Sequence, residues 1–253
     1  MGQMIRIRQQ SGSLQAYVSM PLKRPHFNGA VIIAHEIWGL TDQIQRVADR
    51  FAEEGFYAIA PDLFSTDDVD RRPSQDLQRE IFSPSAHVRY EAMPKLRALI
   101  APTQTPHFTL LALSRLSACF EYVYNQPLVH QRVMMVGFGL GGDYTFGLAI
   151  REPRLLGAVP FYGHAPRTAA ELSHIQCPIL AIYGGKEQSL VRSLSSMSVR
   201  MHQANVDFKA VVFDDAGHAF FNDSNVFAYN QTAADDAWRR TLTFMRKQTG
   251  VAF

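Results

Sequence analysis

Short apolar runs alternate with longer amphipathic segments along most of the chain, and this alternation constrains the fold more than any other feature. The strand-sized runs lie at residues 30–34, 56–60, 132–136, 156–161, 179–183 and 208–213. Segments with helical periodicity lie at residues 42–54, 86–100, 110–125, 143–150, 190–204 and 232–247. Runs that are apolar on both faces are typical of central parallel strands covered by helices. We therefore expect an α/β fold, with a mostly parallel central sheet and helices on both faces.

The first twenty residues show a different pattern, which predicts an antiparallel hairpin. Residues 5–8 and 14–20 are strand-like, and Ser11, Gly12 and Ser13 lie between them as the expected turn. A chain of 253 residues can form one large domain or two small ones. We find no convincing linker and no internal repeat, so residues 1–253 are predicted to form a single domain.

Charge and composition exclude several classes of function. The 25 basic and 23 acidic side chains leave a net charge of +2, which does not favour a nucleic-acid partner. No apolar run approaches the roughly 20 residues of a membrane span, and the first residues lack the features of a signal peptide. We therefore expect a cytoplasmic protein with no membrane partner. Cys119 and Cys177 are too few and too far apart for a disulfide framework or a zinc site, and no metal or cofactor is expected.

A glycine cluster at residues 137–142, Gly-Phe-Gly-Leu-Gly-Gly, follows an apolar strand and precedes a helix. Dinucleotide binding is one interpretation, but the cluster lies in mid-chain and lacks the acidic residue that a ribose site needs. A second interpretation is structural, because glycines let a helix pack close to a sheet. The third is a nucleophile elbow, Gly-x-nucleophile-x-Gly, on a sharp strand-to-helix turn. In that interpretation Gly139 takes the position of the nucleophile.

Two later strand ends carry an acid and a histidine. Glu187 follows the strand that begins at residue 179, and His218 follows the strand that ends at residue 213. The order Gly139, Glu187, His218 is the nucleophile–acid–histidine order of the α/β-hydrolase triad. A lone histidine in such a loop would more often be a surface residue. Together, the three positions predict convergence at the carboxyl ends of neighbouring strands, with His218 hydrogen-bonded to Glu187.

The loop after the first long strand, His35-Glu36-Ile37-Trp38-Gly39-Leu40, is the third candidate element. In an α/β-hydrolase this loop supplies one backbone N–H to the oxyanion hole, and the residue after the nucleophile supplies another. By position, the expected oxyanion-binding donors are Ile37 and Leu140. The alternative is that Glu36 is a solvated loop residue and Trp38 only a core anchor.

These stretches together resemble the dienelactone hydrolase family of α/β-hydrolases. The matching segments are residues 35–40, 60–64 (Ala-Pro-Asp-Leu-Phe), 137–142, 183–187 (Tyr-Gly-Gly-Lys-Glu) and 216–222 (Ala-Gly-His-Ala-Phe-Phe-Asn). The resemblance implies an α/β-hydrolase fold and the hydrolysis of small cyclic or activated esters, with dienelactone as the type substrate. It also implies a cysteine nucleophile at the elbow, His218 as the base, and a role for Glu36 in generating the thiolate.

The chain departs from the family at two positions. The acid is Glu187 where the family usually has aspartate, and the elbow residue is Gly139, which has no side chain. Covalent catalysis needs a thiolate or an alkoxide, and neither Cys119 nor Cys177 is placed to supply one. Because an elbow nucleophile adopts strained backbone angles that glycine tolerates, we expect the fold to survive this change.

Several functions remain compatible with these observations. One is a hydrolase-like protein that binds a small ester or lactone and hydrolyses it weakly or not at all, with His218 or Glu36 activating water. The alternative is a non-catalytic small-molecule binding protein on the same scaffold, and an inactive variant made by design would have the same sequence. A homo-oligomer is compatible with the sequence.

Two carboxylates carry further expectations. Because position 139 offers no thiol as a partner, we expect Glu36 to turn toward His218, a cation or water. We expect Asp143 to interact favourably with the dipole of its helix.

Overall fold

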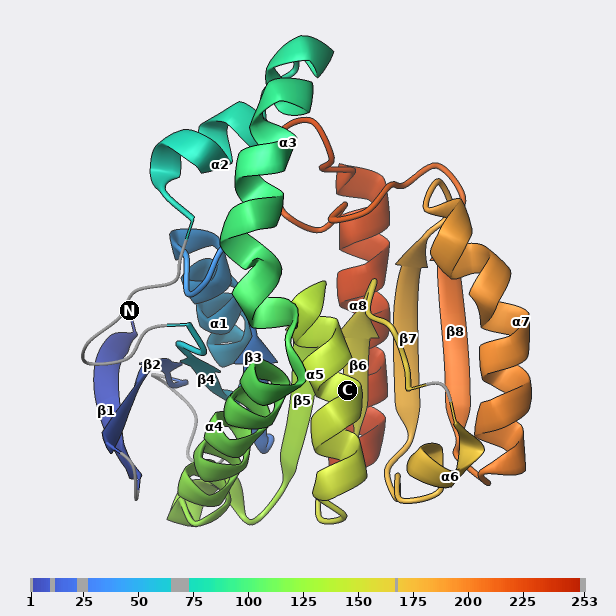
Figure 1. The fold of residues 1–253 in the computed structure, drawn as a ribbon. Helices are drawn as coiled ribbons and strands as arrows, with labels where there is room; N and C mark the ends of the chain where they lie inside the picture. The colour runs from blue at the N-terminus through green and yellow to red at the C-terminus, as the bar shows by residue number, and fades with distance from the viewer. Residues whose placement is uncertain (1, 10–11, 22–26, 65–72, 167, 251–253) are drawn as a thin grey trace.

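The computed structural model describes residues 2–9, 12–21, 27–64, 73–166 and 168–250 (Figure 1). Its eight strands form one sheet in the order β1-β2-β4-β3-β5-β6-β7-β8. The strands are β1 (Gln3–Gln9), β2 (Gly12–Ser19), β3 (Ala30–Ala34), β4 (Tyr57–Pro61), β5 (Val133–Phe138), β6 (Ala158–Phe161), β7 (Ile179–Gly184) and β8 (Phe208–Phe213). The hairpin β1–β2 and the pair β2–β4 are antiparallel, and all other pairs are parallel.

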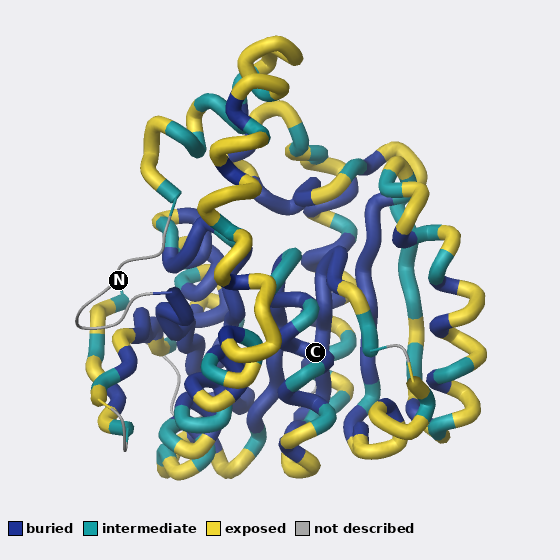
Figure 2. Tube along the Cα trace, viewed as in Figure 1, coloured by how far each residue is buried: buried dark blue, intermediate teal, exposed yellow. Residues whose placement is uncertain are grey.

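The middle of the sheet is the core of the molecule. Every residue of β3, β4, β5, β6 and β7 is buried, as their unbroken apolar sequences predict. The two edge strands differ, because β1 is mostly exposed and β8 is mostly half-buried. Figure 2 shows this contrast between the buried sheet and the exposed outer surfaces of the helices.

Helices cover both faces of the sheet. Helices α4 (Pro106–Tyr124) and α5 (Leu140–Arg151) lie on the face toward the viewer in Figure 1. Helices α1 (Asp42–Glu53) and α8 (Gln231–Thr249) lie on the other face, where the Arg50 guanidinium is 4.2 Å from the centre of the Trp238 ring. Helix α7 (Gln188–Gln203) packs along β8.

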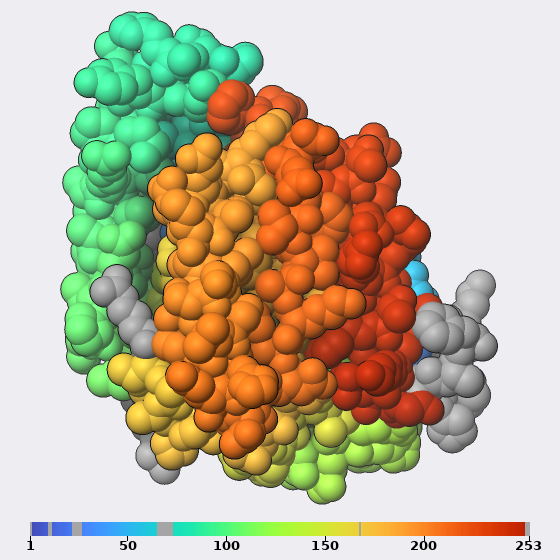
Figure 3. All heavy atoms as spheres, turned by 90° about the vertical axis from the view of Figure 1, so that its right-hand side faces the viewer, coloured from blue at the N-terminus to red at the C-terminus, as the bar shows by residue number. Residues whose placement is uncertain are grey.

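Two further helices, α2 (Gln75–Ile81) and α3 (Ala86–Ile100), form a cap above the carboxyl ends of the strands (Figures 1 and 3). The cap has its own apolar cluster of Trp38, Phe82 and Leu96, separate from the main core. The Trp38 and Phe82 rings meet edge to face with their centroids 5.0 Å apart. The cap is therefore attached to the molecule partly through the loop that carries Glu36.

Some elements differ from the sequence-based expectations. Helix α5 begins at Leu140 rather than near residue 143, because the chain enters it directly from Gly139. Helix α2, the four-residue helix α6 (Ala169–Leu172) and the 3₁₀ turns η1 (Ala101–Gln104) and η2 (Pro127–Val129) were not expected. The expected hairpin turn lies partly outside the described residues. No helix in the described ranges is both long and apolar enough to cross a membrane.

Candidate active site

Four loops at the carboxyl ends of the strands carry the candidate residues. Glu36 follows β3, Gly139 joins β5 to α5, Glu187 follows β7, and His218 follows β8. Because β3 pairs with β5 and β7 pairs with β8, in parallel, these ends lie along one edge of the sheet. In open α/β sheets this edge, near the point where the strand order reverses, is where ligands bind.

Gly139 has backbone angles of φ 54° and ψ −115°, which side-chain-bearing residues rarely adopt. Its N–H donates to the Phe161 carbonyl over 3.0 Å, and its own carbonyl accepts from Gly142 N–H at 2.8 Å. A Cβ atom built on Gly139 would lie 3.9 Å from His218 Nε2 and 3.9 Å from Glu36 Cγ, at ordinary contact distance. The turn therefore has the sharp geometry of a nucleophile elbow, and space for a side chain between the two ionisable groups.

The other glycines of the cluster bring α5 close to the sheet. A Cβ on Gly141 would lie 2.3 Å from the Ala34 carbonyl oxygen, and one on Gly142 would lie 2.7 Å from that of Phe161. Backbone atoms cannot move away as a flexible side chain can. The structural interpretation of the cluster thus holds for these two glycines, alongside the elbow geometry at Gly139.

His218 and Glu187 form a direct hydrogen bond, with 2.7 Å between Nδ1 and Oε2. The Nδ1–H group donates to the carboxylate, so the lone pair of Nε2 in the neutral ring faces the space above Gly139. Burial alone would lower the pKa of His218. The hydrogen bond to Glu187, together with the negative charges of Glu187 and Glu36, outweighs burial and raises the pKa of the imidazole. A glutamate in place of aspartate still reaches the ring.

Glu36 is only 6% exposed, so the interpretation as a solvated loop residue is wrong. Its Oε1 accepts from the Tyr162 hydroxyl at 3.2 Å, and its Oε2 accepts from Asn222 Nδ2 at 2.7 Å. Burial raises the pKa of Glu36, while the two hydrogen bonds and the nearby His218 act in the opposite direction. Its hydrogen-bond partners are therefore two neutral side chains, which the sequence did not predict, while His218 lies near enough to act on the pKa of Glu36 without a hydrogen bond.

Sequence reasoning assigned no role to Tyr162 or Asn222. Asn222 lay inside the matched segment 216–222, and Tyr162 directly follows β6, so a strand-end position was the only signal for it. Tyr162 is buried and has a φ of 41°, and its ring centroid is 5.0 Å from that of His218. A bulky residue with positive φ carries backbone strain of about 1–3 kcal/mol, and such strain gathers at functional sites.

The two expected oxyanion donors border the same space. Ile37 and Leu140 line the pocket that contains Glu36, Gly139 and His218. Within the described residues, neither backbone N–H donates to another protein group. Leu140 is the first residue of α5, where N–H groups lack a helical partner and the helix dipole favours negative charge. Both donors are therefore free to bind an oxygen of a ligand.

Comparison with known proteins decides the family. The model of the dienelactone hydrolase family matches residues 14–249, which is nearly the whole chain. The chain belongs to this family.

Relatives agree with this assignment. A protein of Saccharolobus solfataricus, provisionally named a carboxymethylenebutenolidase, is 30% identical over 232 residues, or 86% of this chain and 89% of the relative. A provisionally named dienelactone hydrolase from Klebsiella pneumoniae has a similar structure, with a TM-score of 0.78, 24% identity and 98% coverage of both chains. A dienelactone hydrolase-like promiscuous phosphotriesterase from metagenomic libraries gives a TM-score of 0.75 at 19% identity, with 98% of both chains covered. The chain therefore has the α/β-hydrolase fold.

In this dienelactone hydrolase family member, the cap forms one wall of an open apolar pocket beside the candidate residues. The cavity has a volume of about 310 Å³, and the cap supplies Ile81, Phe82, Arg89 and Leu96 to its wall. Arg89 lies over the Phe227 ring with 3.6 Å to its centroid, and it donates to the Ser83 carbonyl over 2.6 Å. The pocket thus favours an apolar ligand, and Arg89 is the one arginine or lysine among the described residues of its wall.

The remaining sequence candidates lie elsewhere. Cys119 and Cys177 are buried in the packed core, where burial raises the pKa of both thiols, that of Cys177 to about 12. Asp143 does more than favour a helix dipole, because its Oδ1 accepts from the His164 N–H at 2.6 Å. Among the described residues, no cluster of three or more His, Cys, Asp or Glu side chains could hold a metal ion.

Proposed function

We propose that this family member binds a small ester or lactone and hydrolyses it weakly or not at all, because position 139 has no nucleophilic side chain. One observation carries the proposal. The site of a Cβ on Gly139 is open and lies 3.9 Å from His218 Nε2. The acid, the base and the two oxyanion donors surround a position from which only the attacking atom is missing.

Any hydrolysis would then use water directly. The neutral His218 ring, oriented by Glu187, takes a proton from water at Nε2 while the water oxygen attacks the ester carbonyl. The carbonyl oxygen becomes negatively charged and is stabilised by the N–H groups of Ile37 and Leu140. The proton on His218 then passes to the leaving alcohol, so that no acyl-enzyme forms. Serine hydrolases that lack a triad member retain roughly 10³–10⁴-fold catalysis over water, from the oxyanion hole and binding.

The alternative is binding without turnover. The observation that favours it is the combination of a side-chain-free elbow with an apolar pocket of about 310 Å³, large enough for a small aryl ester. The two functions predict the same occupant and differ only in whether the bound ester is hydrolysed.

The deciding experiment compares the native chain with Gly139→Cys, Gly139→Ser and Gly139→Ala on p-nitrophenyl acetate and dihydrocoumarin. Removing the nucleophile from a complete triad costs up to about 10⁶-fold, so restoring it should raise the rate by at least roughly tenfold even if strain limits the recovery. Gly139→Ala is the matched control, because it adds the same backbone strain without a reacting atom. Iodoacetamide should inactivate Gly139→Cys and leave the native rate unchanged.

Two results would contradict parts of this account. Fast hydrolysis by the native chain with a burst of product would show that another residue attacks the ester. A folded Gly139→Cys variant with no gain on either substrate would favour the pure binding protein.

A further inference from the structure

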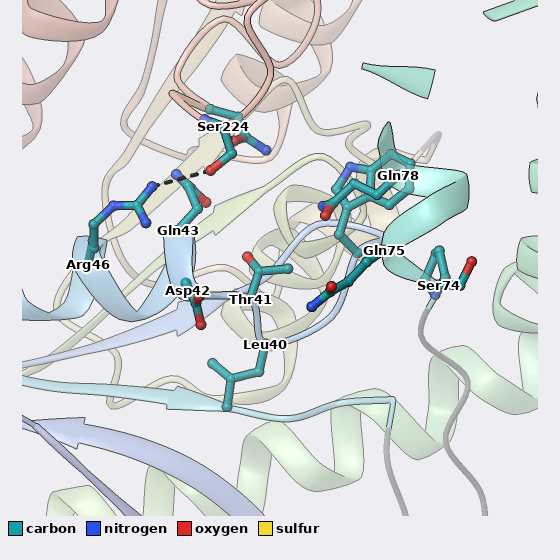
Figure 4. Close-up of a pocket in the computed structure, with 12 residues that line it drawn as sticks. Leu40, Thr41, Asp42, Gln43, Arg46, Ser74, Gln75, Gln78 and Ser224 are labelled. Carbon is teal, nitrogen blue, oxygen red and sulfur yellow. Dashed lines mark hydrogen bonds between the residues drawn. The ribbon is translucent and has the colours of Figure 1, made fainter. Parts of the chain in front are cut away.

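A second, polar pocket has a volume of about 530 Å³, and Figure 4 shows the residues that line it. It is bounded by the first residues of α1 and by α2 of the cap. Trp38 lines both pockets. Asn222, which donates to Glu36, also lines the polar pocket. The polar pocket therefore shares a wall with the site that would hold the ester.

The wall of the polar pocket consists mainly of amide and hydroxyl groups. Gln75 and Gln78 come from α2, Thr41 and Gln43 from the start of α1, and Ser224 from the loop after β8. These groups act as both donors and acceptors and carry no charge. This composition contrasts with the apolar lining of the neighbouring pocket.

The charged side chains that line the polar pocket in the described part of the chain do not include a free cation. Arg46 is ion-paired with Asp223 at 2.7 Å and donates to Ser224 Oγ at 3.2 Å, as Figure 4 shows for the serine contact. Asp42 is the other charged residue among the described residues of the wall. Among the described residues of the wall, a carboxylate or phosphate ligand would find no uncommitted positive partner, and these residues favour a neutral ligand.

Gln43 points most directly to a ligand. It is only 6% exposed, and no group in the described part of the chain hydrogen-bonds to its amide. The amide is not sealed inside the core, because Gln43 is absent from the enclosed polar groups that lack a partner, and it therefore faces the pocket. The opening beside Gln43 is the pocket itself. A ligand hydroxyl can donate to the amide oxygen and accept from the amide nitrogen, which supplies the missing partners.

We propose that the polar pocket is a second subsite, which binds a neutral, hydroxyl-rich group of the ester, such as a sugar or polyol moiety, while the apolar pocket holds the other part. The inference rests on the proposed function, because it assumes that the Glu36–His218 site binds the ester. It adds the substrate class, namely an ester between an apolar acid and a polyhydroxylated alcohol.

The test measures binding, so it does not depend on turnover. A Trp238→Phe background leaves Trp38, which lines both pockets, as the only tryptophan. Fluorescence titration with 6-O-benzoylglucose and with methyl benzoate then compares an ester that reaches both pockets with one that fills only the apolar pocket. We expect the sugar ester to bind more tightly.

In the same background, Gln43→Leu should weaken binding of the sugar ester by about five- to tenfold, as expected for one lost hydrogen-bonding group. Binding of methyl benzoate should stay unchanged. Gln78→Leu, on the opposite wall, should also weaken binding of the sugar ester. Gln203→Leu, on the exposed end of α7, is the matched control and should leave binding of both esters unchanged.

The outcomes separate the two proposals. The polar subsite is refuted, and the proposed function stands, if methyl benzoate binds and the sugar ester binds no more tightly. The same conclusion holds if Gln43→Leu and Gln78→Leu leave the affinity for the sugar ester unchanged. If neither ester binds, the proposed function fails, and the inference that depends on it fails as well.

Discussion

The Glu36 carboxylate is buried near His218. Its two hydrogen-bond partners, Tyr162 and Asn222, are neutral side chains. Burial raises its pKa above the unfolded value, so the folded state holds the proton more tightly than the unfolded state does. For such a group, stability is highest when the carboxyl is protonated and falls as the pH rises through the unfolded pKa toward the folded pKa. Tyr162 and Asn222 reduce this cost, since both donate to the carboxylate.

At the residue scale, we predict that Glu36→Gln raises the melting temperature at pH 8 and that the gain shrinks as the pH falls toward 4. A glutamine can keep both hydrogen bonds, accepting from Asn222 and donating to the Tyr162 oxygen, without the cost of a buried charge. Thermal unfolding of both proteins across this pH range measures the effect, with Glu53→Gln on the exposed face of α1 as the control. A gain that grows on acidification would contradict the raised pKa.

Helix α5 shows how an element positions the site. Its first residue, Leu140, carries the proposed oxyanion donor, and the close approach of the helix to the sheet depends on Gly141 and Gly142. The glycine cluster therefore has two separable functions. Gly139 permits unusual backbone angles in an open space, whereas Gly141 permits contact with the backbone of β3.

At the element scale, we predict that Gly141→Ala destabilises the protein more than Gly139→Ala, which in turn destabilises it more than Gly217→Ala. The first adds a Cβ 2.3 Å from a β3 carbonyl oxygen, at a cost of about 3 kcal/mol, near the upper end for overpacking. The second adds only backbone strain, and a Cβ on Gly217 meets nothing within 4 Å. Urea unfolding gives the order directly, and a Gly141→Ala variant as stable as the native chain would show that α5 can shift.

The whole molecule combines a large sheet core with a small cap that has its own apolar cluster. The cap contributes part of the wall of the apolar pocket and one side of the polar pocket. Regions with few buried apolar contacts open locally at lower free energy than the core does. Helix α2 has no buried residue, and α3 buries only Ala92 and Leu96.

At the scale of the molecule, we predict that Leu96→Ala loosens the cap while the sheet stays intact. Amide hydrogen exchange should accelerate in residues 75–100, with little change in the strands. The matched control is Leu116→Ala in α4, which lies in the main core and should lower the global free energy of unfolding by about 2–5 kcal/mol. Uniform acceleration of exchange by Leu96→Ala would show instead that cap and core unfold together.

The sequence alone determined the α/β class, the extent of most strands and helices, and the loops that carry Glu36, Gly139, Glu187 and His218. Each of these follows from spacing within one element or from a short motif, because side chains two to four residues apart share a face. The bond between His218 and Glu187 was also predictable, since their parallel strands end at the same edge of the sheet.

Only the tertiary structure decided which groups surround Glu36. Tyr162 and Asn222 reach it from distant parts of the chain, and no periodicity in either segment signals the contact. The short helix α2 depends on packing against α3, and the unpaired amide of Gln43 is visible only when its neighbours are known. Local sequence patterns determine the helices and strands. These contacts depend instead on the order of the strands in the sheet, which brings distant segments of the chain together.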